Sequence, residues 1–264
     1  METVGKVVAL LTDFGVRDYF VAEMKAVILS ISPDAVLVDI THDVPPQDVA
    51  SGAFVLWRAY KWFPKGTIFI GVVDPGVGTE RAPIIIKTKN YIFLGPDNGL
   101  LSLASEEDGV DEVYEITVRL AQTSYTFHGR DIFAYAAALI LKGVELKYIG
   151  APRGSFVKLE KPGAELVEGG ARVKVIYIDR FGNIFTSLTR DIALKLFNYN
   201  NILCIKYKNN IIRVPLAPSY GYVGRGEILA LINSEGFLEI AENRGNASAR
   251  LELNVGDELE IRKC

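Results

Sequence analysis

The stretch VVALLTD (7–13), followed by DYFVAEMKAVILSISP (18–33) and AVLVDIT (35–41), decides the fold class. The first and third segments are short apolar runs, which predict buried strands. The second segment is apolar at helical spacing and ends at a proline, which predicts a helix. A strand, a helix and a strand in this order are typical of a parallel sheet covered by helices.

The same alternation continues over the following hundred residues. A helix opened by proline is predicted over 45–63, a third buried strand over 67–74, a hairpin over 83–97 and a short helix over 98–107. These elements predict an N-terminal α/β domain over residues 1–152, with a mainly parallel sheet whose two faces carry helices.

The composition of the sequence then changes. Residues 153–166, RGSFVKLEKPGAEL, are rich in glycine, proline and lysine and are predicted to be a linker. Over 167–264, short apolar segments alternate with turn sequences such as KNN, SEG and VGD, which predicts an all-β C-terminal barrel domain. The strands are expected over 171–179, 184–189, 202–208, 211–216, 227–233, 237–242, 249–254 and 257–263.

Composition excludes several classes of function. The 264 residues carry a net charge of −3 with both signs interspersed, so no basic stripe predicts nucleic-acid binding. Cys204 and Cys264 are far apart and lack metal-binding spacing, so we expect neither a metal site nor a disulfide. The N-terminus lacks the pattern of a signal peptide, and the longest apolar stretches, about ten residues, are too short to span a bilayer. We therefore expect a cytoplasmic protein without membrane contact.

The loop DPGVGTER (74–81) places an acid and an arginine seven residues apart on a glycine-rich bend. Such loops often bind phosphate, but the dinucleotide pattern G-x-G-x-x-G needs a glycine where Arg81 stands. Asp74 and Glu80 would also repel a pyrophosphate. Phosphate binding is therefore disfavoured, and the loop calls for another explanation.

Three acids, Asp13, Asp74 and Asp97, stand at the ends of predicted strands. The carboxyl ends of parallel strands share one edge of a sheet, and ligands bind at that edge. An Asp beside Pro, Asn or Gly is also a common turn former, so the structural alternative stays open for each.

The chain has two histidines, His42 and His128. His128 precedes a predicted helix that Asp131 is expected to help start, and a helix N-terminus disfavours the imidazolium form. A neutral His128 is therefore expected, either as a catalytic group or as a structural one. For His42, which follows a strand and precedes a proline turn, packing of the turn is favoured over catalysis.

In the C-terminal half, Asp179, Phe181 and Asn183 alternate in the segment YIDRFGN (177–183). If the segment is extended, the three side chains project to one side and suit a polar ligand such as a nucleoside or an amino acid. The alternative is a strand that leads into a type I turn at residues 180–182.

Six motifs in this order, LLTDFG, DPGVGTER, LGPDNG, FHGRDIFA, IDRFGN and INSEGFLEIAEN, resemble those of the S-adenosyl-L-methionine hydroxide adenosyltransferase family, which is related to the fluorinases and chlorinases. The resemblance covers about residues 5–262. It implies an α/β domain, a β-barrel domain and a homotrimer whose sites lie between the N-domain of one subunit and the C-domain of the next. It also implies that S-adenosyl-L-methionine is the substrate, split by water into adenosine and L-methionine without a cofactor or metal.

The resemblance also implies the site residues. Asp74, Arg81 and His128 match the family's catalytic triad, with Asp74 and Arg81 orienting the water beside C5′ and His128 accepting or relaying its proton. The expected substrate-binding residues are Asp13, Phe14, Asp179, Phe181, Asn183, Tyr220, Ser234 and Asn243. Glu235 and Glu242 stand where the halogenases have basic residues, which leaves the contacts to the carboxylate and adenine ends open.

Two alternatives to hydrolysis remain at this point. The fluorinases carry an insertion in the N-domain that is absent between DPGVGTER and FHGRD, so transfer of water is favoured over transfer of halide. Halide transfer to give 5′-halo-5′-deoxyadenosine is the first alternative, and a non-catalytic protein that binds S-adenosyl-L-methionine or adenosine is the second. A methyltransferase is disfavoured because LLTDFGVRD, after the first strand, has a single glycine.

Overall fold

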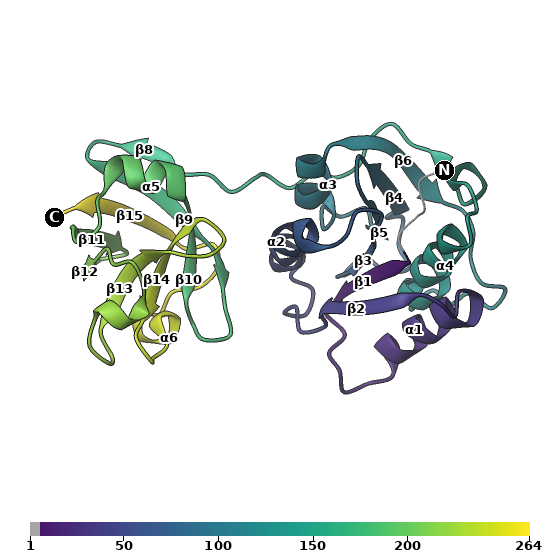
Figure 1. Cartoon of the computed structure of the whole chain (residues 1–264), viewed down its shortest axis with the longest axis horizontal. Helices are drawn as coiled ribbons and strands as arrows, with labels where there is room; N and C mark the ends of the chain where they lie inside the picture. Colours follow the sequence, from purple (N-terminus) through teal and green to yellow (C-terminus); the bar gives the residue numbers. More distant parts are fainter. Residues whose placement is uncertain (1–5) are drawn as a thin grey trace. The chain divides into compact units, whose positions relative to one another are not determined.

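The computed structural model of the chain describes residues 6–264. The chain divides into two compact units, which we call the N-unit (Met1–Glu160) and the C-unit (Lys161–Cys264) (Figure 1). The division falls inside the predicted linker, where residues 153–164 contain no helix or strand.

The N-unit is built on a seven-stranded sheet of order β2-β1-β3-β5-β4-β6-β7. The pairs β1–β2, β1–β3 and β3–β5 are parallel, whereas β4–β5, β4–β6 and β6–β7 are antiparallel. The sheet is thus mixed, and the prediction of a mainly parallel sheet is wrong for the half that follows the β4–β5 hairpin, because a hairpin reverses the chain. The strands are β1 Val7–Thr12, β2 Val36–Thr41, β3 Ile68–Val72, β4 Pro83–Thr88, β5 Ile92–Pro96, β6 Val110–Ile116 and β7 Gly150–Pro152.

Helices cover both faces of this sheet, as predicted. In Figure 1, α1 and α4 lie on one side of the sheet, and α2 and α3 lie on the other. The helical segments of the unit are α1 Phe20–Ile31, α2 Val49–Ala59, η1 Tyr60–Trp62, α3 Ser102–Asp108, the π-helix η2 Gly129–Ala134, α4 Tyr135–Leu141 and η3 Leu146–Tyr148.

The period of two along β3 divides its side chains between two cores. Ile68 and Ile70 pack toward the helical segments α1, η2 and α4, in a buried cluster that also holds Met24. Phe69 points to the opposite face, where its ring stacks on that of Phe93 with centroids 5.0 Å apart. The sheet is therefore buried on both sides, which explains why its central strands are continuous apolar runs.

The C-unit is an antiparallel all-β sheet that is nearly closed. Its order is β12-β11-β15-β9-β10-β14-β13, with β8 paired to β9, and an isolated bridge joins Leu216, after β12, to Ala230 in β13. Its elements are β8 Glu165–Val167, β9 Gly170–Ile178, β10 Ile184–Thr189, α5 Arg190–Leu196, β11 Ile202–Tyr207, β12 Asn210–Pro215, η4 Tyr220–Tyr222, β13 Ile228–Ile232, β14 Phe237–Glu242, α6 Ala247–Leu251 and β15 Glu258–Lys263.

One predicted strand of the C-unit is wrong. Most of the segment 249–254 lies in or next to helix α6, and no strand forms there. The side chain of Asn246 accepts a hydrogen bond from the backbone N–H of Ala249 at 2.8 Å, which caps the helix at its N-terminus. Ala247 and Leu251, four residues apart, are buried on one face of this turn, so the apolar residues follow helical spacing.

The expectation of no disulfide is also wrong, because Cys204 and Cys264 are bonded to each other. Cys204 lies in β11 and Cys264 follows β15, and these two strands pair antiparallel. The pairing brings the two Cα atoms to 5.1 Å although 60 residues separate them in sequence. The spacing of the two cysteines along the chain therefore does not predict the disulfide, because the order of the strands brings them together.

Within residues 6–264, no helix has both the length and the apolar character that crossing a bilayer requires.

Candidate active site

The loop 74–81 leaves the carboxyl end of β3 and turns back on itself. Turns are closed by hydrogen bonds from the N–H of Val77 to the carbonyl of Asp74 and from the N–H of Thr79 to that of Gly76. Gly78 has a φ of +77°, and a Cβ there would lie 2.6 Å from the carbonyl oxygen of Tyr125. Only glycine fits this position, and the bend returns Arg81 to Asp74.

Asp74 and Arg81 form a bidentate ion pair, and His128 completes the group. Arg81 Nε donates to Asp74 Oδ1 at 2.9 Å, and Arg81 Nη2 donates to Asp74 Oδ2. The same Nη2 lies 2.9 Å from His128 Nδ1. The structure therefore brings together the three residues predicted to be catalytic, although 47 residues separate Arg81 from His128.

The ring of His128 is neutral in this arrangement. A guanidinium group only donates, so Nδ1 of His128 accepts from Arg81 and the ring proton resides on Nε2. Burial lowers the pKa of His128 below its ordinary value of 6.5, and the positive charge of Arg81 lowers it further. Both effects favour the neutral imidazole that the sequence analysis predicted.

A pocket of about 420 Å³ lies beside this group. Asp74 and His128 contribute to its wall, together with Asp13 and Phe14 from the loop after β1. The pocket is lined by Asp13, Phe14, Phe20, Pro46, Gln47, Val72, Asp74, Pro75, Val77, Thr126, Phe127, His128 and Gly129. Among the described residues, none pairs with Nη1 of Arg81, which is buried. Two N–H groups of the guanidinium are thus left to hold a ligand or a water.

His42 holds the turn after β1, which carries the pocket residues Asp13 and Phe14. Its Nδ1 lies 2.9 Å from Thr12 Oγ1, its Nε2 lies 3.0 Å from Asp39 Oδ1, and its carbonyl accepts from the N–H of Gly15. His42 is buried and does not line the pocket. The sequence favours packing of the proline turn that follows His42, whereas these contacts hold the turn after β1, which carries Asp13.

Asp97, the third acid at a strand end, faces a different part of the N-unit. Its carboxylate accepts from Arg153 Nη2 at 2.9 Å and from the backbone N–H of Val157 at 2.7 Å. These bonds attach the segment that leaves the N-unit, and Asp97 does not line the pocket. Of the three acids, Asp13 and Asp74 therefore remain site candidates.

Asp131 lies in the first turn of the helical segment that follows His128, although it is not the N-cap residue. His128 occupies the N-cap position of η2, and Asp131 lies inside the first turn, where its carboxylate accepts from the N–H of Ser124. The bond runs back to the loop that precedes the segment, and the segment itself opens as a π-helix. π-Helical turns are rare and often occur at functional sites.

In the C-unit, residues 179–183 form a turn and are not extended. Asp179 Oδ1 accepts from the N–H groups of Phe181 and Asn183, both at 2.9 Å, and Asp179 Oδ2 accepts from Asn183 Nδ2 at 2.8 Å. The N–H of Gly182, with φ +82°, reaches the carbonyl of Asp179. The turn alternative is correct, and Phe181 is left 73% exposed at its tip.

Tyr220 belongs to a second polar cluster of the C-unit. Its hydroxyl donates to Glu239 Oε1 at 2.8 Å, and Asn233 Nδ2 donates to Glu239 Oε2 at 3.2 Å. Burial raises the pKa of Glu239, and the negative charge of Asp179 raises it too, so the two clusters are neighbours. Burial and Glu239 also raise the pKa of Tyr220, which keeps its hydroxyl a donor.

Ser234 and Asn243 have weaker claims to a site. Ser234 is exposed, in the turn that Asn233 closes by accepting from the N–H groups of Glu235 and Phe237. Asn243 Nδ2 donates to the carbonyl of Val223 at 2.8 Å, which anchors the segment after η4.

Comparison with known proteins accounts for this combination of units. The model of the SAM hydroxide adenosyltransferase N-terminal domain matches residues 8–150, and that of the C-terminal domain matches residues 173–260. The chain belongs to this family. Both halves of the family are present, in the order that the motifs of the sequence indicated.

Individual members of the SAM hydroxide adenosyltransferase family and their relatives match over nearly the full length. The chain is 36% identical over 263 residues to an (R)-S-adenosyl-L-methionine hydrolase of Methanocaldococcus jannaschii, covering 97% of this chain and 95% of the relative. It is 29% identical over 291 residues to a fluorinase of Actinoplanes sp., covering 98% of each. The crystal structure of an uncharacterized conserved protein from Thermotoga maritima matches with a TM-score of 0.92 and 39% identity, covering 97% of this chain and 100% of the other.

The family motifs did not reveal Glu239, which the structure places between Tyr220 and Asn233. Glu239 is the single acid inside the apolar run FLEIA (237–241), and this isolation is the feature that could have identified it. For metals, no cluster of three or more His, Cys, Asp or Glu side chains suited to an ion occurs within residues 6–264.

Proposed function

We infer that this chain is an S-adenosyl-L-methionine hydrolase, which splits its substrate into adenosine and L-methionine by attack of water at C5′. The observation that carries this conclusion is the Asp74–Arg81–His128 group, of which Asp74 and His128 line a pocket, while Nη1 of Arg81 is buried without a partner among the described residues. The full-length relatives named (R)-S-adenosyl-L-methionine hydrolase support it.

Hydrolysis is favoured over halide transfer by the same comparisons. The alignment with the fluorinase is less identical, and it extends over 291 positions although the chain has 264 residues, so the fluorinase contains segments that this chain lacks. The alignment with the hydrolase extends over 263 positions. The names of the hydrolases specify the (R) form of the substrate, and we propose the same form for this chain.

The reaction needs a positioned water more than it needs a strong base. The sulfonium sulfur leaves with the electron pair of the C5′–S bond as neutral thioether, so no acid is required on that side. Positioning contributes about 7–11 kcal/mol to such reactions, whereas general base catalysis contributes about 10²–10⁴-fold in rate. We propose that Arg81 Nη1 and Asp74 hold the water in line with the departing sulfur.

The geometry also suggests where the proton goes. As the new C–O bond forms, the oxygen becomes a strongly acidic oxonium, for which a carboxylate is a sufficient acceptor. His128 Nδ1 already accepts from Arg81, and Nε2 carries the ring proton. We therefore propose that Asp74 takes the proton and passes it to solvent, while neutral His128 fixes the guanidinium. This assignment replaces the expectation that His128 accepts or relays the proton.

We propose that the substrate's amino-acid and ribose end is bound by Asp179, Phe181, Asn183, Tyr220, Ser234 and Asn243 of a neighbouring subunit, and its nucleoside end by Asp13 and Phe14. We propose from the family resemblance that the active enzyme is a homotrimer. The turn of residues 179–183, which leaves Phe181 exposed at its tip, and the polar cluster of Tyr220 and Glu239 support the binding role. Measuring the mass in solution by light scattering tests the trimer.

The experiment that tests the function is incubation of the protein with S-adenosyl-L-methionine in chloride-free buffer, followed by chromatography of the products. We expect adenosine and methionine, and a loss of at least about 10²–10³-fold in kcat for Asp74→Asn/Arg81→Met, because the water loses the donor of Arg81 and the carboxylate acceptor of Asp74. The matched control Lys87→Met/Glu112→Gln removes an ion pair of the same unit outside the pocket and should keep full activity. A 5′-halo product in high chloride, or binding without turnover, would contradict hydrolysis.

A further inference from the structure

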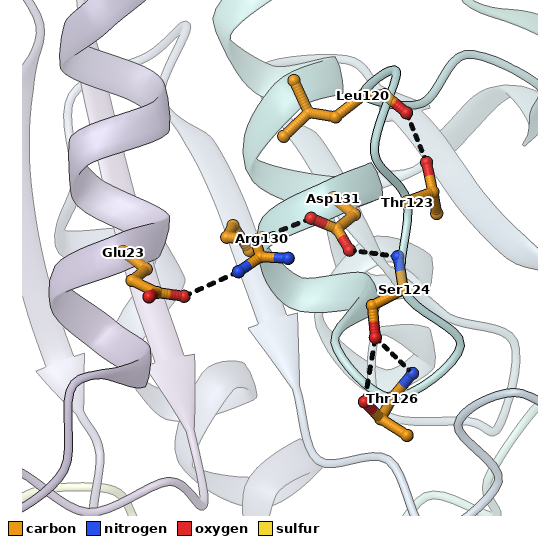
Figure 2. Close-up of polar contacts among 7 residues, drawn as sticks. All are labelled: Glu23, Leu120, Thr123, Ser124, Thr126, Arg130 and Asp131. Carbon is orange, nitrogen blue, oxygen red and sulfur yellow. Dashed lines mark hydrogen bonds and ion pairs between the residues drawn. The ribbon is translucent and has the colours of Figure 1, made fainter.

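The loop that precedes His128 is held by a chain of polar contacts that no catalytic step uses. Figure 2 shows this chain running from Glu23 through Arg130 and Asp131 to Ser124. It begins on helix α1, crosses the first turn of η2 and ends in the loop. It therefore links the body of the N-unit to one wall of the pocket.

Asp131 is the central member of this chain. Its side chain is fully buried, and both of its oxygens are occupied: Oδ2 accepts from the N–H of Ser124 at 2.7 Å, and Oδ1 accepts from Arg130 Nε at 2.6 Å. Its carbonyl also accepts from the N–H of Leu120 at 3.0 Å. One residue thus fixes two points of the loop, 120 and 124.

Arg130 is itself fixed from two sides. Its Nη1 donates to Glu23 Oε2 at 2.9 Å, and its guanidinium carbon lies 5.1 Å from the ring centroid of Phe127. Phe127 lines the pocket. The guanidinium therefore connects helix α1 both to Asp131 and to Phe127 in the pocket wall.

The loop carries these constraints to the reacting groups. Ser124 Oγ accepts from the N–H of Thr126 at 3.0 Å, and the carbonyl of Tyr125 is the atom that excludes a side chain at Gly78. Residues 126–128 then follow directly as pocket wall, ending at His128 against Arg81. Displacing Ser124 would move the contact at Gly78 and the contact at Arg81 together.

We propose that Asp131 is a positioning residue for the hydrolysis, which holds Ser124 so that His128 stays against Arg81 and Tyr125 stays against Gly78. The proposal rests on the proposed function. It differs from a merely structural role in one respect: loss of Asp131 should change the chemical step and the electrostatics of His128, and not the stability of the N-unit alone.

The charges around His128 mean that the loss of Asp131 can be detected through the pKa of His128. Arg81 and Arg119 lower the pKa of His128, whereas Asp74 and Asp131 raise it, against the lowering by burial. Asp131→Asn removes one of the two charges that favour protonation. It also replaces one acceptor oxygen by an NH₂ group that cannot accept from Ser124 or Arg130.

The test compares Asp131→Asn with the matched control Asp108→Asn. Asp108 likewise accepts from a backbone N–H and a side-chain N–H, both of Asn90, at 2.9 and 2.8 Å, and it does not line the pocket. For Asp131→Asn we expect kcat to fall about 10- to 100-fold with KM within about twofold, because small misplacements of reacting groups cost up to about 10²-fold. Asp108→Asn should keep wild-type kcat.

A second readout needs no substrate. The chain has two histidines, so the imidazole resonances of His128 and His42 can be assigned with His128→Ala and titrated by NMR. The resonance of His128 should titrate at lower pH in Asp131→Asn than in wild type. In Asp108→Asn, its titration should be the same as in wild type. If wild type hydrolyses no substrate, the proposed function fails, and the titration still tests the coupling.

Glu23→Gln covers the case in which Asp131→Asn does not fold. It weakens the hold on Arg130 from the far end of the chain of contacts, and kcat should fall about two- to fivefold, since one hydrogen bond to a charged group is weakened but not lost. Unchanged kcat in both Asp131→Asn and Glu23→Gln, or an unmoved titration of His128, would overturn the proposal.

Discussion

The carboxylates of the candidate site residues are satisfied in opposite ways in the two units. In the N-unit, Asp74 is neutralised by the guanidinium of Arg81, which it binds through both oxygens. In the C-unit, Asp179 and Glu239 accept only from neutral groups: backbone N–H, amide NH₂ and a phenol. Within the described residues, no Lys, Arg or His forms an ion pair with either of them.

The difference teaches how the two units divide the work in the proposed reaction. The N-unit group carries its own counter-ion, so it is rigid and ready to orient a neutral water. The C-unit clusters retain negative charge that a positively charged ligand would compensate. S-adenosyl-L-methionine carries two positive groups, the sulfonium and the α-ammonium, which suits the C-unit clusters as a binding element.

The largest difference between the two units should appear on substitution of Asp179. Asp179→Asn should raise KM about 10- to 100-fold, because a hydrogen bond between a charged pair is worth about 1.5–3 kcal/mol. We expect kcat within about threefold of wild type, since the N-unit group is untouched. Steady-state kinetics check this, with Asp191→Asn, in α5 of the same unit, as the control. A fall in kcat with unchanged KM would show that the units do not divide the work in this way.

A smaller effect should appear in the pH dependence of the N-unit group. His128 must be neutral to accept from Arg81, and its pKa is lowered by burial and then by Arg81. Activity should therefore be lost only as the pH falls below the ordinary value of 6.5. The measurement is kcat between pH 8 and pH 5, where the value at pH 6.5 should exceed half of that at pH 8. A midpoint above pH 6.5 would contradict the neutral arrangement.

The lowered pKa of His128 also affects the stability of the folded protein in the same direction. A histidine whose pKa is lower in the folded state stabilises the protein fully above its unfolded pKa, and this stability is lost as the pH falls toward the folded pKa.

The smallest effect is expected at Glu239. Its pKa is raised, chiefly by burial, so the folded state holds the proton to higher pH than the unfolded state does. The free energy of unfolding should therefore fall as the pH rises above about 4.5. Glu239→Gln should remove this pH dependence, and at pH 5 it should change the free energy of unfolding by no more than about 1 kcal/mol. Urea unfolding at pH 5 and pH 7 checks this, with the exposed Glu168→Gln as control. Equal slopes with pH in Glu239→Gln and wild type would contradict the assignment.

Sequence reasoning located most of the strands and helices because their apolar periodicity is strong. It predicted the strands β1, β2 and β3 to within two residues at each end, since each is a continuous apolar run. It predicted α1 equally closely from helical spacing, whereas the helix predicted over 45–63 exceeds α2 by four residues at each end. It missed β6 and α5, whose sequences, VDEVYEI and RDIALKL, mix charges with apolar residues at no clear period. The disulfide was missed because strand order, and not spacing, joins Cys204 to Cys264.

The site was predictable as far as motifs extend. Asp74, Arg81 and His128 were named from motifs, and the geometry joins them. The polar networks around Asp131 and Glu239 were not predictable, because no motif relates the residues that they join. Asp131 lies 108 residues after Glu23, to which it is joined only through Arg130, and no local pattern encodes such a contact.

The position of β15 has a consequence for synthesis on the ribosome. This strand, the last in sequence order, lies between β11 and β9 in the middle of its sheet, whereas all strands of the N-unit sheet precede residue 153. Domains generally fold in the order in which they emerge, at about 5–20 residues per second. The N-unit can therefore complete its sheet while the C-unit is still being translated. A chain stalled before residue 258 would leave the edges of β9 and β11 open, and open edges of this kind pair with other chains.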